Sequence, residues 1–288
     1  MTGAPRSPAD AAGSGSVGLP SATRASRSQT EWVVNRLSGR DWQIIQAVNQ
    51  LRVISGEQLQ RLFFFSLPST RSQVASRTRA LRRLMAWRVL APLERRIGGA
   101  GRGSSGSAFS LNSVGQRLIA QQQHADAQPL RVRRPGTPGD RTLRHAMAVT
   151  ELYIRLVELG RVQGFTTTEF ATEPACWWPN GLGGFVKPDA YVGLVLGDVV
   201  DHWWVEVDMA TESLPTLRRK LETYLDFVRR GQLGPDGVVP RVLVSTVSER
   251  RRDAVCELVR RLPSPAEALF TVVENERAAP GLAMVLRE

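Results

Sequence analysis

Residues 187–208, KPDAYVGLVLGDVVDHWWVEVD, determine the fold of the C-terminal half, because their pattern predicts two strands joined by a tight turn. The pair Gly197-Asp198 suits a two-residue type II′ turn, which sets the pairing of every position further along both strands. In that register Asp189 lies directly opposite Glu206. A longer loop at the turn would shift the register, so the pairing depends on this turn.

The predicted hairpin gathers carboxylates on one face. Asp208 lies two residues beyond Glu206, so its side chain shares the face of Glu206 and Asp189. Like charges placed this way destabilise a sheet unless a cation offsets them. Only two of the 38 basic side chains are lysines, Lys187 and Lys220, and both flank this cluster. We therefore expect a metal ion or a lysine to accompany the carboxylates.

The charge of the chain is unevenly distributed. The 288 residues carry a formal net charge of +11. Residues 1–135 hold 20 arginines and 6 acids, a net of +14, and residues 136–288 hold 18 basic and 21 acidic groups, a net of −3. A basic first half is typical of a module that binds a polyanion, so double-stranded DNA is the expected partner.

Composition excludes several other classes of protein. No segment approaches 18 uncharged apolar residues, so we expect no membrane span. Residues 1–35 are rich in Ala, Ser, Gly and Pro and lack the apolar core of a secretory signal, so they are predicted to be a disordered tail. Cys176 and Cys256 are too few for a disulfide framework or a zinc site, which favours a cytoplasmic location.

Residues 36–123 have the element order of a winged helix-turn-helix domain. Asp41 is the expected N-cap of a first helix, and Ser55 with Gln58 forms a capping-box pattern that opens a second. A third helix is predicted over residues 71–88. Two extended segments, 89–94 and 107–111, follow and flank a loop rich in Gly, Ser and Arg. The third helix would enter the major groove, and the loop would lie along phosphates.

Arginines dominate the polar side of this predicted domain. An arginine-bearing helix face is also common on solvated surfaces, and a winged helix can instead serve protein contacts. The expected DNA contacts on the third helix and in the wing are Arg71, Arg77, Arg79, Arg82, Arg83, Arg95, Arg96 and Arg102.

A linker rich in Pro, Gly and Arg is predicted over residues 124–140 and separates a second domain at residues 141–288. Periodicity predicts helices over 142–159, 214–230 and 249–262, and strands over 165–170, 241–246 and 269–273 in addition to the hairpin. Strands in a meander followed by crossover helices predict a mixed α/β sheet with helices on both faces. The chain as a whole is therefore expected to be α+β with two domains.

The second half resembles the restriction-endonuclease-like fold, whose active site is the PD-(D/E)xK motif. Pro188-Asp189 and Glu206-Val207-Asp208 match that motif, although Asp208 stands at the position of the motif lysine. The resemblance implies that Asp189, Glu206 and Asp208 hold Mg²⁺ or Mn²⁺. It also implies that Lys220, with Lys187 as the fallback, orients the attacking water.

An acid on the first helix of this half, Glu151 or Glu158, would complete such a site. The alternatives are that Glu206 and Asp208 are solvated or paired with arginines, or that the nuclease fold is kept only for DNA or protein contacts. His145 is expected to be structural rather than a general base.

The chain from about residue 40 to residue 273 also resembles the replication-relaxation family of actinobacterial and mobile-element proteins. The matching stretches are Arg40-Asp41, residues 81–84, residues 109–115, His145, residues 188–190, residues 206–212, Lys220-Leu221 and Tyr224. This resemblance implies a role in the replication, maintenance or transfer of a plasmid or an integrated element.

Three hypotheses follow. The first is a DNA-binding protein of a mobile element with a nuclease-like C-terminal domain. The second is an active metal-dependent endonuclease that uses Asp189, Glu206, Asp208 and Lys220 as catalytic residues. The third is a transcriptional or copy-number regulator. A homodimer, or an association with replication or transfer proteins, is compatible with each of them.

Overall fold

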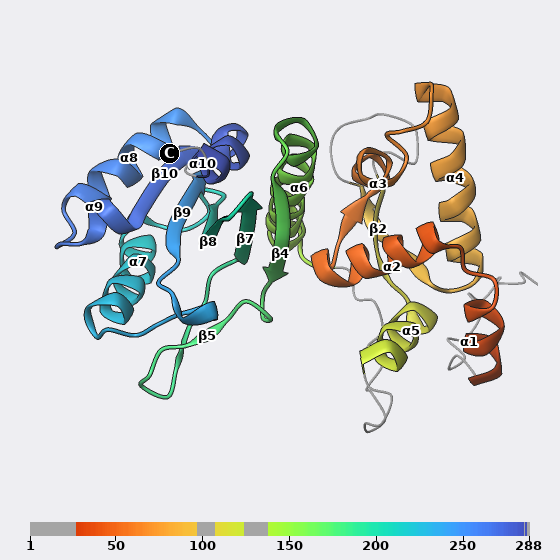
Figure 1. Ribbon diagram of the computed structural model, residues 1–288, viewed down its shortest axis with the longest axis horizontal. Helices are drawn as coiled ribbons and strands as arrows, with labels where there is room; N and C mark the ends of the chain where they lie inside the picture. Colours follow the sequence, from red (N-terminus) through yellow and green to blue (C-terminus); the bar gives the residue numbers. More distant parts are fainter. Residues whose placement is uncertain (1–26, 97–106, 124–137, 285, 287–288) are drawn as a thin grey trace, which may run out of the picture.

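The computed structural model describes residues 27–96, 107–123, 138–284 and 286. It is an α+β protein in which a small helical part with a three-stranded sheet packs beside a larger part built on a five-stranded mixed sheet (Figure 1). None of the helices in the described ranges is long and apolar enough to cross a membrane.

In the described residues, the N-terminal part has five helices and three strands. In chain order they are α1 (Arg27–Val34), α2 (Gly39–Leu51), β1 (Ile54–Ser55), α3 (Gly56–Phe63), α4 (Thr70–Ala86), β2 (Leu90–Arg96), β3 (Ser107–Leu111) and α5 (Ser113–Gln123). The predicted order of three helices and a hairpin is confirmed, and β1 adds a third strand to the hairpin in the order β1-β3-β2.

Two details of this part correct the sequence prediction. The disordered tail predicted for residues 1–35 is wrong at its C-terminal end, because residues 27–34 form α1. That helix buries Thr30 and Val33, and its Trp32 packs edge-on against Trp87. Residues 1–26 lie outside the described residues.

The N-cap of α2 is Ser38 rather than Asp41. Asp41 sits at the third helical position and completes a capping box with Ser38. The predicted capping box of Ser55 and Gln58 opens α3 as expected.

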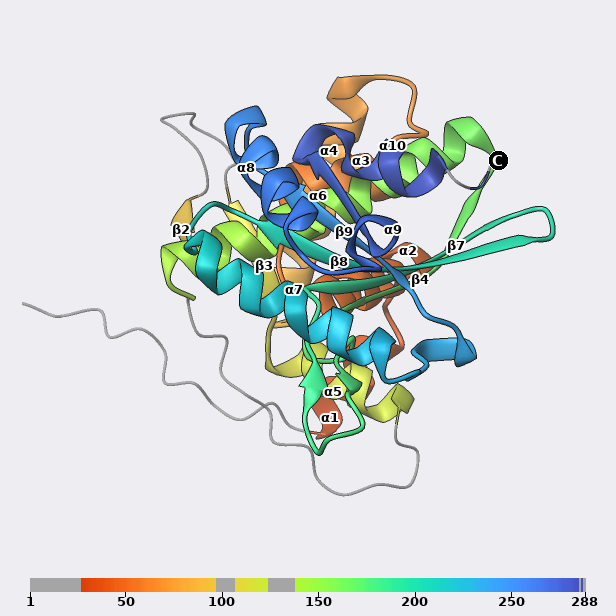
Figure 2. The same cartoon turned by 90° about the vertical axis from the view of Figure 1, so that its left-hand side faces the viewer.

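The C-terminal part is built on a sheet of order β10-β9-β8-β7-β4, in which β10, β9 and β8 are parallel and β8, β7 and β4 are antiparallel (Figures 1 and 2). Its main elements are α6 (Asp140–Gln163), β4 (Thr166–Thr172), β7 (Ala190–Leu196), β8 (Val199–Asp208), α7 (Leu214–Arg229), β9 (Arg241–Thr246), α8 (Glu249–Arg260) and β10 (Phe270–Glu274). The predicted mixed sheet is therefore confirmed.

Several short elements were not predicted. They are β5 (Trp178–Pro179), β6 (Phe185–Val186), α9 (Ala266–Leu269), α10 (Ala278–Met284) and two 3-10 turns, Pro235–Gly237 and Asn275–Arg277. Most are too short to show a period in the sequence. The predicted linker ends one residue early, since α6 begins at Asp140, and residues 124–137 lie outside the described residues.

The β7–β8 hairpin has the predicted register. Leu196 pairs with Val199 and Ala190 pairs with Val205, and Gly197 has a φ of +58°, as the first central position of a type II′ turn requires. Alternate residues of β8 divide between two apolar layers. Trp203 packs with the core that includes α6 and α10, and Trp204 packs with the core under α7 and α8.

The two parts of the chain share one apolar core. Buried side chains of α2, α3 and α4 belong to the same cluster as those of α6, β7 and α10. Polar contacts join the same elements. The Thr150 hydroxyl donates to the Val53 carbonyl at 2.8 Å, and the Arg61 guanidinium binds Glu151 at 2.8 Å and Glu158 at 2.6 Å. The division into two domains stays a prediction, but the parts are packed together.

We expect Arg61→Ala to lower the free energy of unfolding by about 1–3 kcal/mol, because it leaves two half-buried carboxylates without their shared cation. Denaturant unfolding followed by circular dichroism measures this change. The matched control is Arg27→Ala, which removes an exposed ion pair to Glu31 and should change stability by no more than about 0.5 kcal/mol. Equal losses in the two variants would contradict the role of Arg61 in joining the parts.

Candidate functional site

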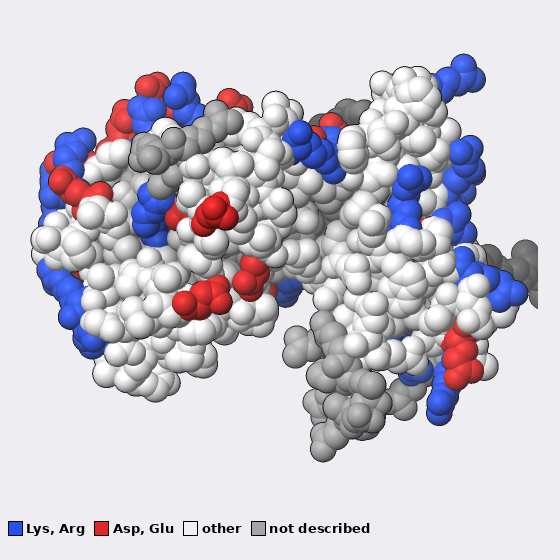
Figure 3. Space-filling view, viewed as in Figure 1, with Lys and Arg blue, Asp and Glu red and all other residues white. Residues whose placement is uncertain are grey.

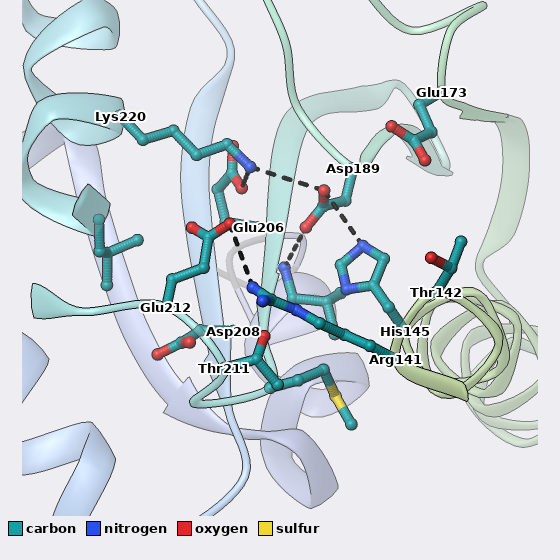
Figure 4. Close-up of a pocket in the computed structure, with 13 residues that line it drawn as sticks. Arg141, Thr142, His145, Glu173, Asp189, Glu206, Asp208, Thr211, Glu212 and Lys220 are labelled. Carbon is teal, nitrogen blue, oxygen red and sulfur yellow. Dashed lines mark hydrogen bonds and ion pairs between the residues drawn. The ribbon is translucent and has the colours of Figure 1, made fainter. Parts of the chain in front are cut away.

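A cleft of about 330 Å³ opens at the C-terminal end of β8, between α6 and α7 (Figure 4). The carboxyl end of a strand is the usual place for a site in an α/β sheet. The cleft is lined by Arg141, Thr142, His145, Glu173, Asp189, Glu206, Val207, Asp208, Met209, Thr211, Glu212, Leu217 and Lys220.

Asp189 directly precedes β7 and is held from two sides. Its Oδ2 accepts a hydrogen bond from the Val207 backbone N–H at 2.7 Å, which ties it to the opposite strand. Its Oδ1 faces the cleft, where it lies 3.2 Å from His145 Nε2 and 3.6 Å from Lys220 Nζ (Figure 4). The backbone thus holds one oxygen of Asp189 in place, and the other oxygen faces the cleft.

Glu206 is almost fully buried, with 2% of its surface exposed. The Tyr224 hydroxyl donates to its Oε1, and its Oε2 forms an ion pair with Lys220. Lys220 and Tyr224 are four residues apart on α7, so one face of that helix supplies both partners. The structure therefore brings together three of the four predicted catalytic residues, Asp189, Glu206 and Lys220.

Asp208 lies in the same cleft but has a different partner. Arg251 from α8 binds it through Nε at 2.5 Å and through a terminal nitrogen at 3.3 Å, and the Ala210 N–H donates to Oδ1 at 2.9 Å. Both oxygens of Asp208 are thus paired with groups other than Lys220, and its expected role as a third metal ligand stays a prediction. Within the described ranges, no three His, Cys, Asp or Glu side chains are placed to hold a metal ion together.

The acids expected from the first helix do not reach the site. Glu151 and Glu158 lie on the side of α6 that faces α3, where Arg61 binds both. Helix α6 instead lines the cleft with Arg141, Thr142 and His145. Of these, His145 contacts Asp189, and the sequence had not marked it as functional. Its spacing from Arg141, one helical turn earlier, was the available signal. Lys187 stacks its ammonium over the Trp177 ring at 4.7 Å and does not line the cleft.

Burial and mutual charge shift the pKa values of this cluster. Burial raises the pKa of Glu206 to about 8, and the nearby Asp189 charge adds to the effect, although Lys220 and Tyr224 oppose it. Burial would also raise the pKa of Asp189, but the hydrogen bond from His145 and the charge of Lys220 hold it below its ordinary value. The hydrogen bond to Asp189 raises the pKa of His145 despite burial.

Lys220 is the cation that offsets the carboxylates. Burial favours its neutral form, but the charges of Glu206 and Asp189 outweigh burial and raise its pKa above the ordinary value. The ammonium therefore stays charged at neutral pH and lies between the two carboxyl groups, where the hairpin pattern predicted a cation.

The predicted DNA contacts on α4 separate into two groups. Arg71, Arg79 and Arg82 are exposed and lie along one side of the helix. Basic side chains gather over α4 at the edge of the molecule in Figure 3.

Arg77 and Arg83 do not belong to that exposed face. Arg77 is 5% exposed and donates to Gln60 at 2.9 Å, and Arg83 binds the buried Asp41 at 2.6 Å. Arg77 is therefore buried in the fold, whereas Arg83 keeps 40% of its side chain exposed while it is paired with Asp41. The backbone of β2 includes Arg95 and Arg96, whose side chains are outside the described part, and Arg102 lies outside the described residues.

The architecture and the cleft define an α+β protein with a carboxylate–lysine site on a mixed sheet. The chain belongs to the replication-relaxation family, whose model matches residues 45–242. No curated protein matches it.

Among solved structures, the restriction endonuclease FokI bound to DNA is similar at 12% identity and a TM-score of 0.26. The match covers 91% of this chain and 45% of that one, so the chain spans less than half the length of FokI. A similarity at this level carries no argument about fold or activity.

We expect Glu206→Gln to become increasingly more stable than the wild type as pH rises from about 4.5 to about 8. Over that range the unfolded carboxyl ionises while the native one keeps its proton, so the wild type alone loses stability, by at most about 1.4 kcal/mol per pH unit. The measurement is the free energy of unfolding of both proteins against pH.

His145 also changes stability with pH, because its raised pKa adds stability at low pH that is lost as the pH rises through that pKa. This contribution is present in both proteins and cancels in the difference between their free energies of unfolding. Glu212→Gln, at the exposed rim of the cleft, is the control and should show no such trend. A constant difference between wild type and Glu206→Gln would refute the raised pKa of Glu206.

Proposed function

We propose that this chain is a DNA-binding protein that acts in the replication, maintenance or transfer of a plasmid or another mobile element. Its membership in the replication-relaxation family supports the association with replication. The observation that carries DNA binding is the exposed side of α4, where Arg71, Arg79 and Arg82 point to solvent together. Guanidinium groups spaced along one helix face suit the phosphates of a duplex.

The element order supports a winged-helix interpretation of this part. Helices α2, α3 and α4 precede the hairpin β2–β3, and α4 is the third helix, the one that enters the major groove in such domains. The inner arginines of α4 strengthen the argument, because Arg77 and Arg83 anchor the helix to α3 and α2. The outer arginines therefore project from a helix whose position is fixed before DNA arrives.

We expect the wild-type protein to bind duplex DNA with an affinity that falls steeply as salt increases, because bound phosphates release counterions. Replacing Arg71, Arg79 and Arg82 together by Ala should weaken binding. It should also lower the slope of log K against log salt by about one for each lost phosphate contact. Fluorescence anisotropy of a labelled duplex at several salt concentrations measures both quantities.

The charge-matched control replaces Arg218, Arg260 and Arg261 of the C-terminal part by Ala. These side chains are exposed and form ion pairs with helix neighbours, so the variant removes the same number of arginines away from α4. Its affinity and salt slope should stay near those of the wild type. An affinity that does not depend on salt, or an equal loss in both variants, would contradict the proposal.

A second candidate function is that of a metal-dependent DNA endonuclease with a nuclease-like C-terminal domain. The observation that favours it is the meeting of Asp189, Glu206 and Lys220 in one cleft. Two carboxylates suffice for Mg²⁺, which keeps several of its waters, and Lys220 already places a cation between their oxygens. The pair Asp189 and Glu206 therefore fits a divalent ion, whereas Asp208 is committed to Arg251.

In such a site a bound Mg²⁺ or Mn²⁺ would supply Lewis acidity toward a phosphodiester. The residues of the chain have separate tasks in this proposal. Asp189 and Glu206 would hold the ion, His145 and Tyr224 would fix the orientation of these carboxylates, and Lys220 would orient the attacking water.

We expect wild-type protein to nick supercoiled plasmid with Mg²⁺ or Mn²⁺ but not with EDTA, and Glu206→Ala to lose this cleavage while keeping DNA binding. Gel electrophoresis of the plasmid reads the result, and Glu212→Ala at the rim is the control. Cleavage that survives Glu206→Ala would rule out this site as its source. Salt-sensitive binding without any cleavage would leave the DNA-binding function alone, and a preference for one discrete operator would then favour a regulator.

A further inference from the structure

The two carboxylates of the cleft each present one oxygen and anchor the other. Asp189 Oδ2 is tied to the Val207 N–H, and Glu206 Oε1 is tied to the Tyr224 hydroxyl. The remaining oxygens, Asp189 Oδ1 and Glu206 Oε2, converge on the Lys220 ammonium, and Asp189 Oδ1 also lies 3.2 Å from His145 Nε2. They form a cation site that is already assembled, because fixed hydrogen bonds hold both carboxylates in place.

We propose that Lys220 is a built-in competitor for this site, so that a divalent metal ion binds Asp189 and Glu206 only when the ammonium withdraws. The inference rests on the endonuclease candidate above for the identity of the metal, and it assigns Lys220 a second role in the same cleft. When both carboxyl groups are ionised, a positive charge must stay near them, since they are buried beside each other. The ammonium holds the place until the metal arrives.

The position of Lys220 allows this exchange. Its side chain is 32% exposed, whereas the side chains of Asp189 and Glu206 are 11% and 3% exposed, so the ammonium can move toward solvent and the carboxylates cannot. A lysine stem is flexible and its ammonium is a compact point charge. Arg251 is different, because it grips Asp208 through two nitrogens and also donates to the Glu212 carbonyl at 2.9 Å. The proposed exchange therefore does not include Asp208.

Under competition, the apparent metal affinity equals the intrinsic affinity multiplied by the fraction of time in which the two oxygens are free of the ammonium. Removing the ammonium should consequently raise the affinity. We expect Lys220→Ala to bind Mn²⁺ about ten-fold more tightly than the wild type, which corresponds to oxygens that are free about a tenth of the time. The combination of Lys220→Ala with Glu206→Gln should lose this gain. Titration calorimetry without DNA measures the affinity independently of any cleavage.

The chain offers a matched control because it has only one other lysine. Lys187→Ala removes the same charge from a residue that packs on Trp177 outside the cleft. Its Mn²⁺ affinity should stay within about a factor of two of the wild type, since an exposed charge outside the cleft is largely screened by solvent and salt. If Lys220→Ala does not fold, Lys220→Gln removes the charge and keeps most of the length.

Because the chain has only two lysines, the exchange can also be tested in the wild-type protein. Protein labelled with ¹³C at the lysine ε-carbon should give two signals, and Lys187→Arg assigns them. Titration with Mg²⁺ should shift the Lys220 signal to saturation as its ion pairs break, and leave the Lys187 signal in place.

Mg²⁺ binding that leaves the Lys220 signal unchanged would overturn the competition, and so would equal or weaker Mn²⁺ binding by Lys220→Ala. Absence of binding by both proteins would overturn it as well. Metal binding with the expected competition but without plasmid nicking would refute only the endonuclease.

Discussion

The antiparallel register of β7 and β8 is the constraint on which both the sheet and the site depend. A shift by one residue would exchange the two faces, which would place Trp203 with α7 and turn Glu206 into the core beneath α6. The turn at Gly197 prevents this, because its positive φ fixes the pairing from the first position onward. The same register sets Asp189 beside Glu206 and so concentrates negative charge at one end of the sheet.

Every buried carboxylate of that cluster is paired with a cationic side chain from a neighbouring helix. Lys220 from α7 serves Asp189 and Glu206, and Arg251 from α8 serves Asp208. The difference between the two cations divides the cluster. A bidentate guanidinium binds one carboxylate, whereas a flexible ammonium lies between the other two.

Helix α6 connects this cleft to the arginine-bearing part of the chain. Its first turns carry His145 to Asp189 and Arg141 to Glu212 at the rim, and its later turns carry Glu151 to Arg61 of α3. Because α3 in turn contacts α4, one rigid helix lies between the proposed DNA-binding face and the cleft. A duplex held on α4 would thus stand in a defined relation to the sheet, although the two sites lie on different elements.

The sequence by itself determined the local features: the capping box at Ser55, the strands and helices of the sheet, the hairpin register and the pairing of Asp189 with Glu206. These follow from side-chain period, turn chemistry and charge, all of which act between neighbours along the chain or across one turn. It also marked Lys220 as a partner, because lysine is so rare here. The tertiary structure alone decided that Arg251 pairs with Asp208, that His145 rather than Glu151 enters the cleft, and that Arg77 is buried while Arg83 pairs with Asp41. Those outcomes depend on which helix faces pack together, and distant residues that compete for one charge leave no periodic signal in the sequence.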